Sequence, residues 1–375
     1  MAVRVGIDLR CLSPEGEPGA GVSHAARELC TRLIKDQSFE WLAYVPSDAV
    51  WDACPRIPLD SRTGSALRSG LKQEPCDMLF VPSGSIPPFL GVPALPWVHD
   101  LIIFEHPEWF PQSWFKRLVT KTLYLRGLKK APAIFAVSEY TKKKVLEKIG
   151  KRAEKVVVTY EGGDSELAVI KDIQAKKESA RQMIAGKYGF KKPFILCLGT
   201  IEPRKNLAML VRAWKAYRQT LNPKRETRDL VIVGNVGWKY EDVIEEIKAL
   251  PHEAKYHMYL IRRASDETKR NFLLAADMVC VPSLDEGFGL VALEAQQANT
   301  RVISSNAGAL PEVMGQNGVS LDPTDEKAWI EALSDQIDGA TRQNINPEFF
   351  WDKAAEKVLL GLRKYGLPSV RRKKK

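Results

Sequence analysis

The chain has 375 residues, 45% of them hydrophobic and 27% charged, a composition typical of a globular protein with about two domains. No run of about eighteen apolar residues occurs, and the N-terminal MAVRVGIDLR lacks an apolar core, so neither a membrane-spanning helix nor a secretory signal is expected. The six scattered cysteines, without a Cys-x-x-Cys pair, favour reduced thiols over disulfides or a zinc site and predict a cytoplasmic protein.

The formal net charge of +10 is unevenly distributed along the chain. Residues 116–155 contain thirteen Lys or Arg and three acidic residues, and the chain ends in RRKKK at 371–375. Such patches contact nucleic acid, anionic lipid or acidic ligands, or are simply solvated. Because no aromatic-interleaved nucleic-acid motif accompanies the patch, no nucleic-acid partner is predicted.

Short apolar runs alternate with helical patterns in both halves of the chain. The expected strands are 3–7, 42–46, 78–82, 133–137, 156–159, 194–199, 229–233, 257–261, 278–282 and 301–304. The charged stretch 167–192 is expected to hold a helix and to connect the two halves. This alternation predicts doubly wound parallel sheets, in which ligands bind at the carboxyl ends of the strands.

Two places near strand ends in the first half are candidate contacts. Gly19 and Gly21, in the loop after the first strand, could bring the backbone close to a phosphate or a sugar, although a plain turn is the alternative. His99 and Asp100 follow an apolar residue and precede the apolar run LIIF. A single His beside a strand is usually structural, so residues alone do not assign it a function.

Residues 111–130 form a basic segment whose apolar side chains recur at helical spacing. Two interpretations remain open: a domain helix with its apolar face on the core, or a helix lying on a membrane surface. The apolar residues are Trp114, Phe115, Leu118, Val119 and Leu125, and the basic ones among them are Lys116, Arg117, Lys121 and Lys129.

The stretch 285–294, DEGFGLVALE, follows an apolar strand and leads into a helix. Gly287 and Gly289 allow the backbone to approach a ligand closely, and the start of the helix offers free N–H groups to an anion. Glu286 and Glu294 bracket seven other residues. Glu294 falls inside the helix, where a buried carboxylate needs donors such as the hydroxyls of a sugar or ribose.

A second motif, GTIEPRKN at residues 199–206, ends a strand and precedes a helix. It places Arg204 and Lys205 side by side, where a diphosphate could bind. Both side chains are expected to be exposed. A third motif, NAGALPE at 306–312, forms a glycine turn with Pro311 in the first turn of a helix.

These three motifs, in this order, resemble those of the retaining glycosyltransferases of family 4, which have an E-x7-E signature. The resemblance covers nearly the whole chain. It implies an α/β GT-B fold with two Rossmann-like domains facing a central cleft. Residues 1–170 would bind the acceptor and 171–348 the nucleotide-sugar, while 349–375 would form a helix crossing back to the first domain, plus a basic tail.

The resemblance also implies the roles of individual residues. Arg204 and Lys205 would stabilise the leaving diphosphate, Glu286 would contact hydroxyls of the donor sugar, and Glu294 would contact the nucleotide ribose. His99 would hydrogen-bond a sugar hydroxyl. Residues 160–164 depart from the family's Asn-Gly-x-Asp form, so no ligand contact is assigned there. Further contacts to the donor would come from Gly19, Gly21, Asp100, Gly287, Phe288, Gly289 and Leu290.

The resemblance implies transfer of a hexose with retention, and its narrower match to surface-polysaccharide enzymes suggests mannose. Metal independence is predicted because no D-x-D occurs, and no cofactor beyond the nucleotide-sugar is implied. The acceptor would be a saccharide or lipid-linked saccharide of a bacterial surface polysaccharide such as lipopolysaccharide. Peripheral contact with an anionic membrane on its inner face would follow. A nucleotide-sugar epimerase and a non-catalytic nucleotide-sugar-binding protein are the alternatives.

Overall fold

The computed structural model describes residues 2–17, 21–150, 153–190, 192–220, 227–334 and 345–365. Gly19 and the basic tail therefore lie outside the described residues. The chain divides into two compact units. The first unit consists of Met1–Glu105, Gln112–Gly162 and Pro347–Lys375, and the second of His106–Pro111 and Gly163–Asn346.

The first unit is built on a seven-stranded parallel sheet with the strand order β3-β2-β1-β4-β5-β6-β7. This order places a topological switch between β1 and β4, as in doubly wound folds. Most strand residues are buried, as expected for a parallel sheet covered on both faces. The strands are β1 (Val3–Asp8), β2 (Phe39–Pro46), β3 (Arg56–Leu59), β4 (Met78–Val81), β5 (Ala94–Val98), β6 (Ile134–Ala136) and β7 (Val156–Val158).

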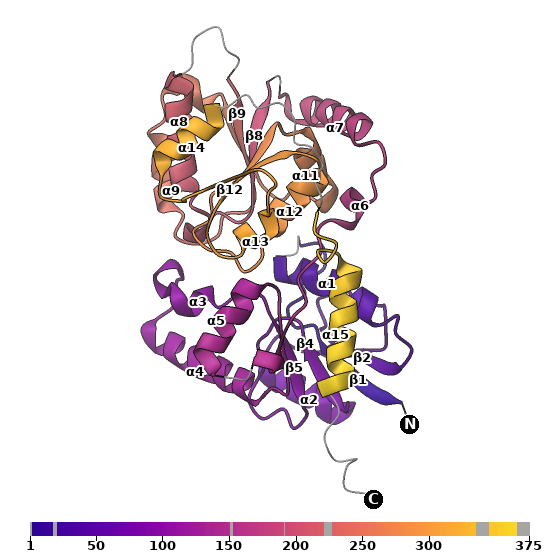
Figure 1. Cartoon of the computed structure of the whole chain (residues 1–375). Helices are drawn as coiled ribbons and strands as arrows, with labels where there is room; N and C mark the ends of the chain where they lie inside the picture. The colour runs from indigo at the N-terminus through magenta and orange to yellow at the C-terminus, as the bar shows by residue number, and fades with distance from the viewer. Residues whose placement is uncertain are drawn as a thin grey trace, which may run out of the picture. The chain divides into compact units, whose positions relative to one another are not determined.

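Helices from both ends of the chain cover this sheet. The last helix, α15, packs beside α1 (Figure 1). Gly162 allows the start of α15 to approach, because a Cβ there would lie 2.5 Å from the backbone nitrogen of Trp351. The helices of the first unit are α1 (Gly21–Leu33), α2 (Gly64–Gln73), α3 (Ile102–Glu105), α4 (Trp114–Lys130), α5 (Glu139–Ile149) and α15 (Trp351–Tyr365).

The second unit repeats the architecture with a six-stranded parallel sheet, in the order β10-β9-β8-β11-β12-β13. Its core includes the buried side chains of Trp214 and Trp329. The strands are β8 (Phe194–Leu198), β9 (Asp229–Val233), β10 (Met258–Ile261), β11 (Met278–Val281), β12 (Arg301–Ser305) and β13 (Val319–Leu321). The helices of eight or more residues are α7 (Ile173–Tyr188), α8 (Leu207–Thr220), α9 (Glu241–Lys248), α11 (Asp266–Ala275), α12 (Leu290–Gln297) and α14 (Glu326–Ser334).

Candidate functional site

The loop between β11 and α12 is held in a conformation that depends on glycine. Gly289 has φ of 111°, a backbone conformation that residues with a Cβ rarely adopt, and a Cβ there would lie 2.7 Å from a Leu310 methyl carbon. The backbone N–H of Ala309 donates to the carbonyl of Glu286 and ties the loop to the turn before α13 (Leu310–Met314). Glu286 therefore lies at the carboxyl end of a central strand, where ligands bind in doubly wound folds.

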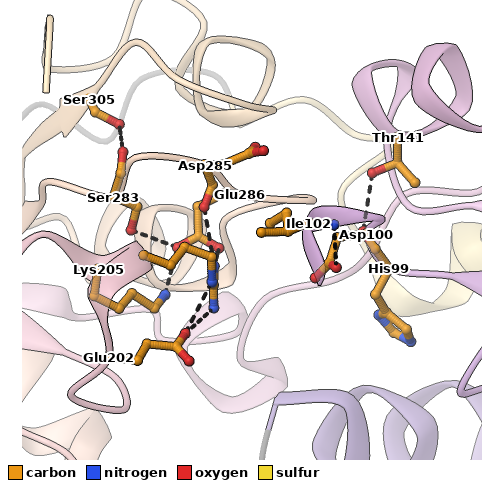
Figure 2. Close-up of polar contacts among 11 residues, drawn as sticks. His99, Asp100, Ile102, Thr141, Glu202, Lys205, Ser283, Asp285, Glu286 and Ser305 are labelled. Atoms are coloured by element: carbon orange, nitrogen blue, oxygen red, sulfur yellow. Dashed lines mark hydrogen bonds and ion pairs between the residues drawn. The ribbon is translucent and has the colours of Figure 1, made fainter. Parts of the chain in front are cut away.

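The Glu286 carboxylate is the centre of a charged cluster (Figure 2). Arg204 Nη1 donates to Oε2 at 2.5 Å, and Lys205 Nζ donates to Oε1 at 2.6 Å. The Ser283 hydroxyl donates to the same Oε1 at 2.7 Å. On its other edge, Arg204 donates through Nη2 and Nε to Glu202 Oε1, at 2.7 and 3.1 Å. The structure thus brings together three of the predicted site residues.

The predicted exposure of the two cations is wrong. The side chains of Arg204 and Lys205 are 19% and 15% exposed, because both turn toward the buried Glu286. Burial by itself would raise the pKa of Glu286. The charges of Arg204 and Lys205 and the hydroxyl of Ser283 outweigh burial and lower this pKa to about 2. Glu286 is therefore ionised at every physiological pH.

Glu294 has the opposite environment. It lies partly buried in α12, and among the described residues its side chain makes no hydrogen bond or ion pair. Burial, followed by the charge of Asp164, raises the pKa of its carboxyl to about 8. The nearby Arg270 compensates little, since it is ion-paired with Asp164 and Glu166. A carboxyl in this environment has room for a hydrogen-bond donor from a ligand. The ribose contact assigned to Glu294 stays a prediction.

His99, in the first unit, has both ring nitrogens engaged. Nε2 donates to the carbonyl of Pro82 and Nδ1 contacts Glu161 Oε1, each at 2.8 Å. Burial lowers the pKa of His99, but the carboxylate of Glu161 outweighs it and the net shift is upward. To bond a sugar hydroxyl, the ring would have to give up one of these contacts. The assigned role therefore stays a prediction.

The other predicted contacts are local in character. Asp100 accepts a hydrogen bond from the backbone N–H of Ile102 at the start of α3 (Figure 2). Gly21 begins α1 with open space around its Cα. Gly287 and the buried Phe288 lie in the loop before α12, and Leu290 is the first residue of that helix.

Three functional candidates were missed by sequence reasoning. Glu202 lies inside GTIEPRKN and Ser283 lies two residues before the 285–294 stretch, yet neither was given a role. Glu161 lies in the loop that was set aside because it departs from the family pattern. A carboxylate two residues before the adjacent cations Arg204 and Lys205 is the signal that could have pointed to Glu202.

No group of three His, Cys, Asp or Glu side chains in the described parts of the chain is arranged to hold a metal ion. Metal independence itself stays a prediction.

Comparison with known families fits this geometry. Residues 4–167 match the family described as "Glycosyltransferase Family 4", and residues 171–347 match the family described as "Glycosyl transferases group 1". Together the two matches cover nearly the whole chain and confirm the resemblance carried by the three motifs. The chain belongs to the glycosyltransferases.

The relatives of this glycosyltransferase include the O-antigen chain mannosyltransferase B of Escherichia coli. It is 30% identical over 245 residues, which cover 65% of the present chain and 60% of the relative. For this relative and three further mannosyltransferases, the match covers between 30% and 60% of their own length.

Solved structures share the fold of this glycosyltransferase at low sequence identity. The Anabaena HepE structure with UDP-glucose matches with a TM-score of 0.67 and 16% identity, over 96% of this chain and 95% of HepE. WaaG, a glycosyltransferase involved in lipopolysaccharide biosynthesis, matches with a TM-score of 0.67 and 16% identity, over 98% of both chains. These matches confirm the predicted GT-B fold.

Proposed function

We propose that this protein transfers a hexose from a nucleotide-diphosphate-sugar to a saccharide acceptor, with retention of the anomeric configuration. The observation that carries the proposal is the cluster of Arg204, Lys205 and Glu286 at the strand ends of the second unit. Cations fixed beside a helix start suit a diphosphate, and a carboxylate among them suits sugar hydroxyls. Family membership supports the same reaction.

In this reaction the bond between the anomeric carbon and the diphosphate breaks, and negative charge builds up on the departing oxygen. Arg204 and Lys205 would stabilise that charge from fixed positions. Attack from the same face, with the leaving phosphate accepting the acceptor's proton, retains configuration without a protein nucleophile. No metal or other cofactor is part of the proposal.

The donor sugar is proposed to be mannose and the acceptor a growing surface polysaccharide or its lipid-linked form. The support is the kind of relative that matches: an O-antigen mannosyltransferase at 30% identity. The UDP-glucose in the HepE structure supports a nucleotide-sugar donor in general, without fixing the base or the sugar of this protein.

The test begins with thermal unfolding in the presence of a panel of nucleotide-sugars. A ligand at a hundred times its dissociation constant adds about 2.7 kcal/mol to the free energy of unfolding. The stabilising donor is then used to measure transfer by Arg204→Gln and Lys205→Gln. Each variant should lose about 100-fold in turnover, since it lacks a contact to the leaving group.

Arg212→Gln is the matched control, because Arg212 is also ion-paired in the second unit, with Glu246 and Glu326. It should transfer at the wild-type rate. Turnover in the Arg204 and Lys205 variants equal to that of this control would contradict the phosphate site.

We also infer that the first unit contacts anionic membranes through α4. The N-terminal half of this helix does not pack on the core: Trp114, Phe115 and Leu118 are 73%, 63% and 55% exposed. The structure describes every residue of α4, and among them Leu128 alone is buried. Exposed aromatic and basic side chains on one helix suit the lipid interface.

No helix in the described residues is long and apolar enough to span a membrane. Contact through α4 would therefore be peripheral and electrostatic, with each basic residue near the surface contributing about 1 kcal/mol.

Flotation with liposomes tests the α4 contact. The protein should float with anionic vesicles at low salt and sediment with neutral vesicles or at high salt. Reversing Lys116, Arg117 and Lys121 to Glu should release it. Reversal of three exposed basic residues of the second unit, Lys176, Lys248 and Arg262, gives a control of equal net charge that should still float. Equal loss in both triple variants would point to net charge alone.

A further inference from the structure

The two cations of the phosphate site are already neutralised by two carboxylates of the protein itself. Glu202 occupies the Nε–Nη2 edge of Arg204, and Glu286 occupies Arg204 Nη1 and Lys205 Nζ. Ser283 adds a hydroxyl to the same carboxylate oxygen that Lys205 contacts. Both cations are therefore charge-paired inside the protein, and Lys205 Nζ and each guanidinium nitrogen of Arg204 already donate to a carboxylate.

The two carboxylates differ in what they occupy. Glu202 follows the turn after β8 and accepts from Nε and Nη2 of Arg204, whereas Glu286 accepts from Nη1. Glu286 instead takes the Nη1 and Nζ donors that the two cations direct at a single anion. A carboxylate that bridges both cations resembles a phosphate in charge and in acceptor geometry.

An incoming diphosphate would meet this carboxylate as a like charge at short range, in a partly buried site where screening is weak. An intact sugar donor differs from the free nucleoside diphosphate in one respect that matters here. Its hydroxyls can donate hydrogen bonds to Glu286 and so satisfy a carboxylate that has left its cations.

We propose that Glu286 is an internal counter-ion of the phosphate site. Its carboxylate leaves Arg204 and Lys205 when the hydroxyls of a donor sugar donate hydrogen bonds to it. The site thereby binds the intact donor in preference to the nucleoside diphosphate product. Product release is favoured, because the carboxylate returns to the cations once the sugar has gone. This inference rests on the proposed function and adds a control of product binding to it.

The variant Glu286→Gln distinguishes a counter-ion from a side chain that contacts only the sugar. If Glu286 contacted only the sugar, this variant would bind free nucleoside diphosphate as the wild type does. As a counter-ion, Glu286 opposes that binding. Removing its charge should therefore tighten the binding of UDP, GDP or pyrophosphate by about tenfold.

Isothermal titration calorimetry measures these affinities for the wild type, Glu286→Gln and the control Glu326→Gln. Glu326 is ion-paired with Arg212 in the same unit, so its variant removes an equal charge away from the site. Thermal unfolding without ligand shows that each variant is folded. The expected result is tighter nucleoside diphosphate and weaker nucleotide-sugar binding for Glu286→Gln, with the control unchanged.

Equal or weaker binding of nucleoside diphosphate by Glu286→Gln, in a protein whose wild type binds it, overturns the counter-ion role and leaves the proposed function intact. Failure of both forms to bind any nucleoside diphosphate or nucleotide-sugar overturns the proposed function, and the inference with it. If Glu286→Gln does not fold, the double variant Glu286→Ala/Lys205→Met replaces it, because it removes one charge of each sign. If this double variant binds pyrophosphate more weakly than Lys205→Met alone, the counter-ion role of Glu286 is likewise overturned.

Discussion

Binding of a nucleotide-sugar should release a proton from Glu294. With a pKa of about 8, roughly nine-tenths of this carboxyl is protonated at pH 7. A ribose diol donates two hydrogen bonds and therefore prefers the ionised carboxylate, which lowers the pKa in the complex. Between pH 6 and pH 8 the ionised fraction rises from about 1% to about 50%, so affinity should tighten roughly 50-fold.

Calorimetry in two buffers of different ionisation enthalpy counts the released protons. A nucleotide-sugar is the suitable ligand, because its diphosphate carries no proton that titrates in this range. Release of about 0.9 proton is expected near pH 7 for the wild type. Glu294→Gln should release none and should bind with an affinity that does not change with pH, which separates Glu294 from every other titrating group.

The same shift has a consequence for stability. Folding raises the pKa of Glu294 above its ordinary 4.5, so the ionised form is disfavoured in the folded protein. Stability should therefore be lost as pH rises from about 4.5 to about 8, and Glu294→Gln should lack that loss. Binding without proton release, together with this pH-dependent stability, would show that the diol meets a protonated Glu294 and would refute the ribose contact as argued.

Two further changes test the second and first units. Burial lowers the pKa of Lys177 from 10.5 to about 8, so unfolding takes up a proton between these pH values. The free energy of unfolding of the wild type should therefore rise by up to about 3 kcal/mol as the pH is raised from about 8 to 10.5. Lys177→Met should lack this gain in urea titrations, whereas the exposed Lys176→Met should keep it. Gly162→Ala should lower stability by about 1–3 kcal/mol, because its Cβ would overlap Trp351, while Gly186→Ala, with open space in a helix, should not.

The sequence predicted the interior of both sheets well. Strands such as Asp229–Val233 are continuous apolar runs, and their alternation with helices identifies a parallel sheet. Three strands are absent from the expected ranges: β3 and β13, each at the edge of its sheet, and β5, which lies between β4 and β6 and contains Pro96. Arg56–Leu59 contains a proline and Val319–Leu321 has three residues, so neither carries a readable pattern.

That Arg204, Lys205 and Glu286 lie at strand ends was predictable, but how they pair was not. The motifs placed Arg204, Lys205 and Glu286 at strand ends on two different loops. Their mutual contact depends on where β8 and β11 lie side by side in the folded sheet. The predicted exposure failed for the same reason, since adjacent cations in a polar loop indicate a solvated surface unless a buried carboxylate comes from elsewhere. Glu161 was missed because its partner, His99, is remote in sequence.

The two glutamates of the E-x7-E stretch show why spacing alone cannot assign roles. They are separated by seven residues, yet the pKa of one is lowered to about 2 and that of the other is raised to about 8. The difference comes from their neighbours: Arg204 and Lys205 surround Glu286, whereas Glu294 lies in a partly buried helix near Asp164. At neutral pH one carboxyl is a fixed charge and the other is mostly a neutral acid. When the environment separates the pKa values of two carboxyl groups in this way, the two groups can take different chemical roles. Glu286 is therefore suited to compete with a diphosphate for cations. Glu294 is suited to bind uncharged hydroxyls, with release of one proton.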